Sequence, residues 1–249
     1  MPPDAGRRFR RLFLVQAAAA CLALLALLAP GRAAAQGAAP EAEPSCPPRG
    51  TPALSVELVD PEPRVLSPLR ASALRAEAGG EDDGPFPHHL GLTVSRVEWR
   101  SEITVRSRGP QGGPVCAVPA EVRLRLVQAE HTIRLAREVP AGGCLAGEVL
   151  AHERRHADVN RRTLREAAAE LRAIARAWAA RAEMRAPDAG AAAVALQDEL
   201  EAAIAPMLDR LRAAREAAHA QIDSPAEYRR LSRVCQADQA KLRAALRRP

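Results

Sequence analysis

Two histidines four residues apart, with a glutamate directly after the first, are the residues in this sequence best suited to chemistry. They lie in the stretch LAHERRHADVNRR as His152, Glu153 and His156. On a helix, residues i and i+4 share one face, so both imidazoles can bind one metal ion. Glu153 lies about 100° around the helix from His152, where it can reach a water molecule on that metal. The spacing predicts a Zn²⁺ site with His152 and His156 as ligands and Glu153 as the general base.

Composition offers a competing explanation of this motif, because Ala, Arg and Glu dominate the segment. Two observations favour a metal site. Both histidines share an apolar helical face with Leu145 and Val149, where an unpaired imidazole is costly to bury. Arg154 and Arg155 fall on the opposite, polar face.

The third metal ligand must come from another element, because the carboxylates further along the same rigid helix lie too far from the histidines. Helices joined by short connections usually run antiparallel. With a turn centred near residue 188, residue 154 faces residue 222, which His219 and Asp223 flank. The sequence predicts His219 as the third ligand, with Asp223 as the alternate ligand or as a partner that orients a histidine. The competing interpretation makes His219 an exposed helix residue and Asp223 a loop residue beside a cap.

Five further polar residues are weaker candidates. Asn160 is a possible hydrogen-bond partner of a ligand, and Tyr228 is a possible oxyanion stabiliser, although packing is the simpler role for it. His131 is expected at a strand edge. The pair His88-His89 lies in a loop rich in glycine and proline and is expected to face solvent.

The elements around the motif predict an α+β fold: a small, mostly antiparallel sheet over residues 53–140, followed by a bundle of three long helices over 145–247. Apolar and polar residues alternate in VEWRSEITVR, EVRLRLV and HTIRLAREV, which is typical of strands with one solvated face. After PAGG the apolar period changes to 3.6. The capping box SPAE begins the last helix, and Pro206 is expected to kink the second. The predicted helices are 145–185, 191–222 and 225–247.

The N-terminal region is predicted to be an export signal, residues 1–35, with basic residues, an apolar run and a small-residue cleavage site. Residues 36–52 are predicted to be a flexible Pro/Ala-rich linker, and residues 53–249 one domain. Without the signal, 31 basic residues oppose 29 acidic ones, so the net charge falls from +6 to +2. No clustered basic stripe remains to predict nucleic-acid binding, and no second long apolar run predicts a stable membrane anchor.

Four cysteines follow the predicted signal, an even number that suggests two disulfides in an exported protein. Three pairings are possible. The sequence favours Cys116–Cys144, which brackets one β segment, together with Cys46–Cys235.

The export signal, the cysteine-bearing β segment, the stretch IRLAREVPAGGCLAGEVLAHERRH and the downstream helix together resemble a family of predicted secreted, zinc-dependent bacterial proteases. The resemblance covers about residues 90–235. It implies a zincin-like fold in which His152 and His156 bind zinc and Glu153 is the base. It also implies that the strand HTIRLARE lines the substrate cleft. This branch commonly uses a glutamate as third ligand, and Glu216 and Glu227 are the glutamates near the predicted position.

The predicted function is that of an exported, periplasmic or secreted zinc metallopeptidase that hydrolyses peptides or proteins. The alternative is a non-catalytic periplasmic helical binding or scaffold protein with a structural or vestigial metal site. Helices laced with arginine and glutamate, which suit helix–helix contacts, favour this alternative. The two differ at the metal, because a structural site is closed and four-coordinate whereas a catalytic site keeps one open position.

Overall fold

The computed structural model describes residues 44–79 and 89–247 of the 249-residue chain. The predicted signal, residues 1–35, and residues 36–43 of the predicted linker lie outside the described residues. Residues 44–52 form no helix or strand, but they are fastened to the domain. Cys46 forms a disulfide with Cys116, and Arg49 pairs with Glu183 at 2.8 Å.

Five strands form one sheet, and the central strand pairs with all of the other four that the structure describes. Val122 of that strand pairs with Ile103 on one side and with Leu54 on the other. One neighbour therefore occupies one edge along its whole length, while three short strands follow one another along the opposite edge. The strands are β1 (Ala53–Val59), β2 (Arg64–Leu66), β3 (Gly91–Arg108), the central β4 (Val115–Leu135) and β5 (Met184–Ala186).

The sheet is mixed, which corrects the prediction of a mostly antiparallel sheet. β3 and β5 run antiparallel to β4, whereas β1 and β2 both run parallel to it. Only a short connection separates β1 from β2, so both strands follow the same edge in the same direction. Alternation of apolar residues reveals which face of a strand is buried, but it does not reveal the direction of its neighbour.

β4 is a single 21-residue strand where the sequence suggested two. Its buried face shifts by one residue between Leu126 and Ile133, which makes the pattern look interrupted. The register shift opposite Arg96 and Val97 leaves Ala129 without a partner and absorbs this change as a β-bulge. The strand therefore continues where the buried residues change from even to odd positions. In the sequence this change looks like a break between two strands.

Five helices are present in the described residues, and only α2 and α3 are long, so the prediction of three long helices was wrong. The helix expected over 225–247 divides into α4 and α5. At the junction Val234 is extended and Cys235 has a positive φ of 59°. Neither residue type signals such a break. The helices are α1 (Ala71–Glu77), α2 (Cys144–Ala179), α3 (Ala189–Ile222), α4 (Pro225–Arg233) and α5 (Gln236–Leu246).

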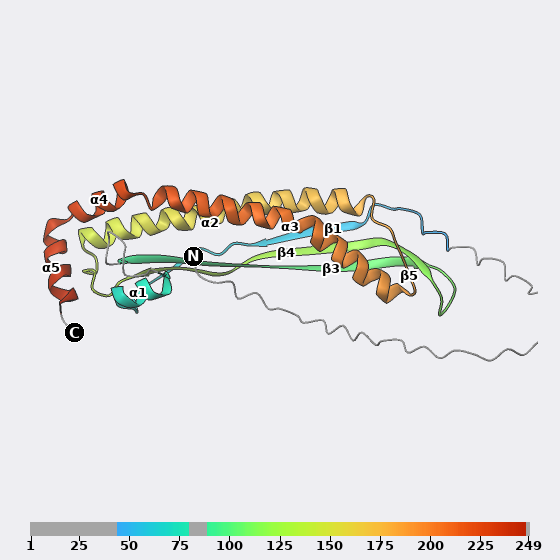
Figure 1. Cartoon of the computed structure of the whole chain (residues 1–249), viewed down its shortest axis with the longest axis horizontal. Helices are drawn as coiled ribbons and strands as arrows, with labels where there is room; N and C mark the ends of the chain where they lie inside the picture. The colour runs from blue at the N-terminus through green and yellow to red at the C-terminus, as the bar shows by residue number, and fades with distance from the viewer. Residues whose placement is uncertain (1–43, 80–88, 248–249) are drawn as a thin grey trace, which may run out of the picture. The chain divides into compact units, whose positions relative to one another are not determined.

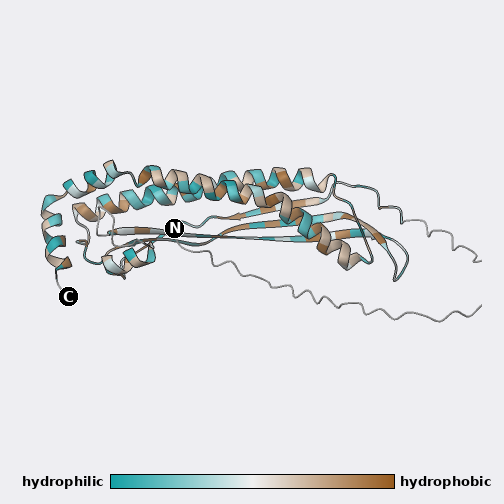
Figure 2. Cartoon of the chain, viewed as in Figure 1, coloured by the Kyte–Doolittle hydropathy of each residue, from teal (hydrophilic) through white to brown (hydrophobic). Residues whose placement is uncertain are grey.

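α2 and α3 lie along the long strands and cover one face of the sheet (Figure 1). Apolar residues of both helices and of β4 form the larger core, and hydrophilic and hydrophobic residues are interleaved along the outer helices (Figure 2). Pro206 lies inside α3, and this helix changes direction along its length (Figure 1). Within residues 44–79 and 89–247, no helix combines the length and apolar character needed to span a membrane. Fully buried core residues include Val122, Leu126, Leu164, Leu171, Leu196, Leu200 and Ile204.

The four cysteines form two disulfides, as predicted, but with a different pairing: Cys46–Cys116 and Cys144–Cys235. Cys116 is the second residue of β4 and Cys144 follows the far end of that strand, so the length of the strand, roughly 60 Å, separates them. The sulfurs of Cys116 and Cys144, which the sequence predicted to be paired, therefore lie at opposite ends of the sheet. Each observed disulfide instead closes one end.

The Cys144–Cys235 disulfide attaches α5 to the first turn of α2. The residue that precedes α2, Gly143, has no side chain to cap the helix. Asp238 of α5 takes that role, because its carboxylate accepts a hydrogen bond from Leu145 N at 3.2 Å. One covalent bond and one remote cap thus hold α5 against the helix that carries the HERRH motif.

Replacing both Cys144 and Cys235 by alanine is expected to lower the free energy of unfolding by about 2–4 kcal/mol, because the 91-residue separation makes the cross-linked loop long. Urea unfolding of the oxidised wild type and the double variant measures the difference. Cys46→Ala/Cys116→Ala is the matched control, with a separation of 70 residues, and should show a loss of similar size. Unchanged unfolding midpoints in both variants would contradict the expected contribution.

Candidate metal centre

Three donor atoms converge where α2 faces the end of α3. His152 Nε2 and His156 Nε2 are 3.2 Å apart, and each lies 3.1 Å from Asp223 Oδ1. A tetrahedral zinc ion with bonds of about 2.0–2.1 Å separates its donor atoms by about 3.3 Å. The three atoms therefore match one face of a zinc coordination tetrahedron, and the remaining corner is available to another ligand.

Local structure explains why these three side chains meet. His152 and His156 lie one turn apart on the buried face of α2. Asp223 is the C-cap residue of α3, and its amide donates to His219 O at 2.9 Å. Ser224 then caps α4 by accepting from Glu227 N at 3.3 Å, as the capping box predicted. The turn between α3 and α4 thereby carries the Asp223 carboxylate onto the histidine pair.

The hydrogen bond between Asp223 and His152 favours the charged form of both groups. Burial raises the pKa of Asp223, but hydrogen bonds with His152 and His156 outweigh it and hold that pKa far below its ordinary value. Burial lowers the pKa of His152, but the hydrogen bond to Asp223 and the negative charges of Glu153 and Asp223 together outweigh it, so that the net shift is upward. An ionised carboxylate and two imidazoles together form a set of ligands suited to a divalent cation.

His219 does not occupy the third ligand position that the sequence predicted for it. Its Nδ1 lies 2.9 Å from Nδ1 of His156, the ring nitrogen that faces away from Asp223. Its Nε2 lies 3.1 Å from Asn160 Oδ1. The helical register was estimated correctly, but the side chain one turn further along, Asp223, reaches the histidine pair, and His219 contacts the back of His156.

This contact gives His219 a different role, that of a positioning residue. Asn160 Oδ1 can only accept, so Nε2 of a neutral His219 carries the proton and its Nδ1 accepts from His156. The proton on His156 Nδ1 leaves its Nε2 lone pair free to bind a metal. Arg215 anchors this chain by donating to Thr163 Oγ1 at 2.9 Å and to the Asn160 carbonyl at 2.7 Å.

Glu227 has an equivalent position behind His152, which adds to the capping role that its sequence context explained. Its Oε1 lies 3.5 Å from His152 Nδ1. Hydrogen bonds from Arg230 lower the pKa of Glu227 to about 2, against the effect of burial, and Arg155 contributes in the same direction. Arg155 Nη2 lies closer to the same nitrogen, at 3.0 Å, and can only donate to it. When His152 binds a metal through Nε2, its Nδ1 carries the proton, which Glu227 and not Arg155 can accept. Neither Glu227 nor Glu216 joins the donor triangle.

Glu153 lies beside the donor triangle, buried between α2 and β3. Thr93 Oγ1 lies 2.7 Å from Glu153 Oε2 and 2.9 Å from the Glu153 carbonyl oxygen. A Cβ atom at Gly91 would lie 2.5 Å from Glu153 Oε1, so only glycine leaves room for this carboxylate. Burial raises the pKa of Glu153, which the Thr93 hydrogen bond partly offsets. The sequence offered no signal for Thr93 or Gly91, because they come from a distant strand.

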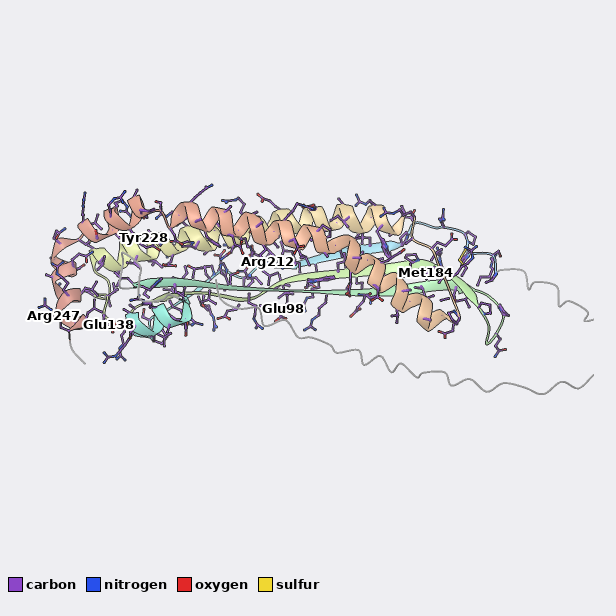
Figure 3. All side chains as sticks on the ribbon, in the orientation of Figure 1. Glu98, Glu138, Met184, Arg212, Tyr228 and Arg247 are labelled. Carbon is purple, nitrogen blue, oxygen red and sulfur yellow. A yellow bond between two sulfur atoms is a disulfide. The ribbon has the colours of Figure 1, made fainter. Side chains whose placement is uncertain are left out.

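Tyr228 lies on α4 (Figure 3) and contacts the same oxygen of Asp223. Its hydroxyl donates to Asp223 Oδ1 at 3.0 Å. Burial raises the pKa of Tyr228, and the Asp223 charge adds to the shift, so the hydroxyl keeps its proton. Tyr228 therefore offers a hydrogen-bond donor at the edge of the centre, in addition to packing 5.9 Å from the His152 ring.

The centre opens into a cavity of about 880 Å³ that His152, Glu153, His156 and Asp223 help to line. Residues 91–93 of β3 form its strand wall, which corrects the expectation that HTIRLARE lines the cleft. That segment belongs to the end of the central strand β4 and the turn that follows it, and none of its residues lines the cavity.

The remaining described histidines, His131 and His89, lie in environments that differ from those the sequence predicted. His131 is buried in β4, where its Nδ1 lies 3.2 Å from the Pro61 carbonyl oxygen, so it is not at a strand edge. His89 is half-buried and lines the cavity, whereas the sequence placed it toward solvent. Burial lowers its pKa, and Arg75 lowers it further. His88 lies outside the described residues.

One other group of metal-type side chains occurs in the described part of the chain: Cys46, Cys116 and Glu183. The two cysteines are joined in a disulfide, so their thiolates are not available as ligands. The histidine–aspartate centre is therefore the better candidate. Comparisons with protein-family models, with curated proteins and with solved structures find no match to this chain.

Proposed function

We propose that the protein is a zinc-dependent hydrolase that cleaves peptide bonds, with His152, His156 and Asp223 as the zinc ligands. The observation that supports this most strongly is the donor triangle, with edges of 3.1–3.2 Å, next to a buried carboxylate and an open cavity. A zinc ion in this position supplies a water molecule that ionises near neutral pH and can attack a carbonyl carbon. The proposal keeps the predicted roles of three residues and exchanges His219 for Asp223.

Each neighbouring side chain has a distinct task in this proposal. Glu153 accepts the proton of the attacking water and returns it to the leaving amine, and the Thr93 hydrogen bond fixes its direction. The Tyr228 hydroxyl, whose one hydrogen goes to Asp223 Oδ1 in this structure, turns from that oxygen to donate to the substrate oxygen that becomes negative as the carbonyl is attacked. His219 and Glu227 hold the two ligand imidazoles in the orientation that metal binding requires.

A non-catalytic binding or scaffold protein with a structural metal is the competing proposal. Four protein ligands usually close a structural zinc site. Here three donors are grouped in the described residues, and the cavity supplies the approach for a further ligand. Among residues 44–79 and 89–247, Glu153 forms no ion pair with Lys or Arg and is hydrogen-bonded to Thr93, which a purely structural metal site does not require. These features favour hydrolysis over a scaffold role.

We also propose that the protein is exported and that it resembles secreted zinc-dependent bacterial proteases. The two disulfides suit an oxidising compartment, which supports export to the periplasm or the medium. The residues that carry the resemblance to secreted zinc-dependent bacterial proteases remain in their proposed roles. An aspartate takes the third position in this chain, where that branch commonly has glutamate.

Removing the metal is expected to abolish hydrolysis reversibly. The purified protein, freed of metal with a chelator and dialysed, should lose its activity on a mixture of denatured protein and random peptides. One equivalent of Zn²⁺ should restore it, and Mg²⁺ should not, because two imidazoles favour zinc. Mass spectrometry of the products measures the cleavage. Full activity of the metal-free protein, or products that contain no cleaved peptide bond, would refute the proposed function.

A further inference from the structure

The cavity beside the metal centre is a compartment with an apolar body. The metal ligands and Glu153 occupy one part of its wall, while leucines from β3, α4 and α5 supply much of the remainder. A volume of about 880 Å³ is large for a single side chain and falls in the range that holds ligands of several residues. The leucines in the lining are Leu90, Leu92, Leu231, Leu242 and Leu246.

α5 forms one wall of this cavity. The residues of α5 that line the cavity, including Leu242, Arg243 and Leu246, recur at helical spacing, so one face of the helix is turned toward it. The Cys144–Cys235 disulfide and the Asp238 cap fasten α5 to the start of α2. The helix is therefore held at a fixed position relative to the metal centre.

Two arginines on the same face of α5 give the cavity a positive rim. Arg243 and Arg247 both line it, and Arg247 lies at the opposite end of the α4–α5 segment from Tyr228 (Figure 3). Arg247 Nε donates to the Arg243 carbonyl oxygen at 3.2 Å. Neither guanidinium pairs with a carboxylate of residues 44–79 or 89–247, so both can bind an anionic group of a ligand.

Resting on the proposed function, we propose that the cavity selects peptide segments with an apolar side chain beside the cleaved bond and a carboxylate beyond it. The leucines of β3 and α5 take the apolar side chain, and Arg243 with Arg247 takes the carboxylate. The carboxylate can be the C-terminus of the peptide or an acidic side chain. Both supply the same planar anion, for which the guanidinium is the matching partner.

The test uses the zinc-loaded full chain and synthetic peptides that are free or amidated at the C-terminus, each with or without an internal acidic residue. We expect cleavage next to Leu, Ile, Val or Phe. Amidation should lower kcat/KM about tenfold in peptides without an acidic residue, which identifies the C-terminus as one source of the anion. A smaller effect of amidation in peptides with an acidic residue identifies the side chain as the other source.

Two substitutions connect these preferences to α5. Arg243→Glu should lower kcat/KM about tenfold for carboxylate-bearing peptides and much less for fully amidated, uncharged peptides. Leu246→Gln should lower it about fivefold for peptides with an apolar side chain. Exposed residues outside the cavity provide matched controls: Arg162→Glu on α2, and Val194→Gln at a side chain that is 62% exposed. Equal preferences in wild type and α5 variants would overturn the proposal.

A binding measurement separates this proposal from the proposed function. Labelled peptide bound to the zinc-loaded Glu153→Gln variant should dissociate about tenfold more readily when Arg243→Glu is added. Arg243-dependent binding, together with a zinc-loaded wild type that hydrolyses none of these peptides, would sustain binding in the cavity and refute hydrolysis. If wild type hydrolyses peptides equally well with and without the apolar side chain and the carboxylate, the proposed function stands and the cavity proposal is refuted. Absence of binding to any of these peptides also refutes the cavity proposal.

Discussion

The Glu153→Gln variant is expected to lose about 10²–10⁴-fold in kcat while retaining one zinc ion per chain. Glutamine has the same shape and can keep the hydrogen bond with Thr93 Oγ1, but it cannot accept a proton. Glu153 is absent from the three-donor group, so its replacement leaves the zinc ligands intact. Steady-state hydrolysis and metal analysis of the same preparation measure both quantities.

Glu166→Gln is the matched control for this variant, because Glu166 is an exposed glutamate on the same helix. It should retain both zinc and activity. If Glu153→Gln keeps wild-type kcat, another group must be the general base. If it loses zinc together with activity, Glu153 is a ligand, and the division of tasks proposed for the HERRH motif is wrong.

Asp223→Ala and His219→Ala are expected to weaken zinc binding to different extents and for different reasons. Structural zinc sites bind with about 10–16 kcal/mol, so the loss of one of their four ligands corresponds to about 3 kcal/mol, or at least about 100-fold in affinity. Asp223→Ala should show a loss of this size. His219→Ala removes only the partner of His156 Nδ1 and should lose about 10-fold to 100-fold, as replacements of such partners do.

X-ray absorption of the zinc-loaded variants separates a ligand from a positioning residue when the affinities overlap. Wild type and His219→Ala should both show two imidazoles bound to zinc. A spectrum with three imidazoles in wild type and two in His219→Ala would restore the role that the sequence predicted for His219. His219→Gln should recover part of the lost affinity, because an amide can replace one of the two hydrogen bonds.

The parts of the site on α2 were predictable because one helix positions them. The spacing of His152 and His156 sets both rings on one face, and the apolar period extends over many turns and identifies that face as buried. The antiparallel pairing of α2 with α3 gave the correct level of the third donor. It did not distinguish His219 from Asp223, because that choice depends on how α3 ends and α4 begins.

The residues that the sequence did not reveal act across long separations. Thr93 is 60 positions from Glu153, and Asp238 is 93 positions from Leu145. Their roles depend on the pairing of β3 with β4 and on the break at Cys235, which neither periodicity nor a turn residue marks. The disulfide pairing failed for a related reason, since it requires knowing which end of a strand each cysteine occupies.

Anomalous diffraction at the zinc edge from crystals of the zinc-loaded protein tests the central claim most directly. We predict one strong peak per chain, about 2.0–2.1 Å from His152 Nε2, His156 Nε2 and a carboxylate oxygen of Asp223, with Glu153 outside bonding distance. A map without a peak between these three side chains, or with the zinc bound only elsewhere on the chain, would contradict the account.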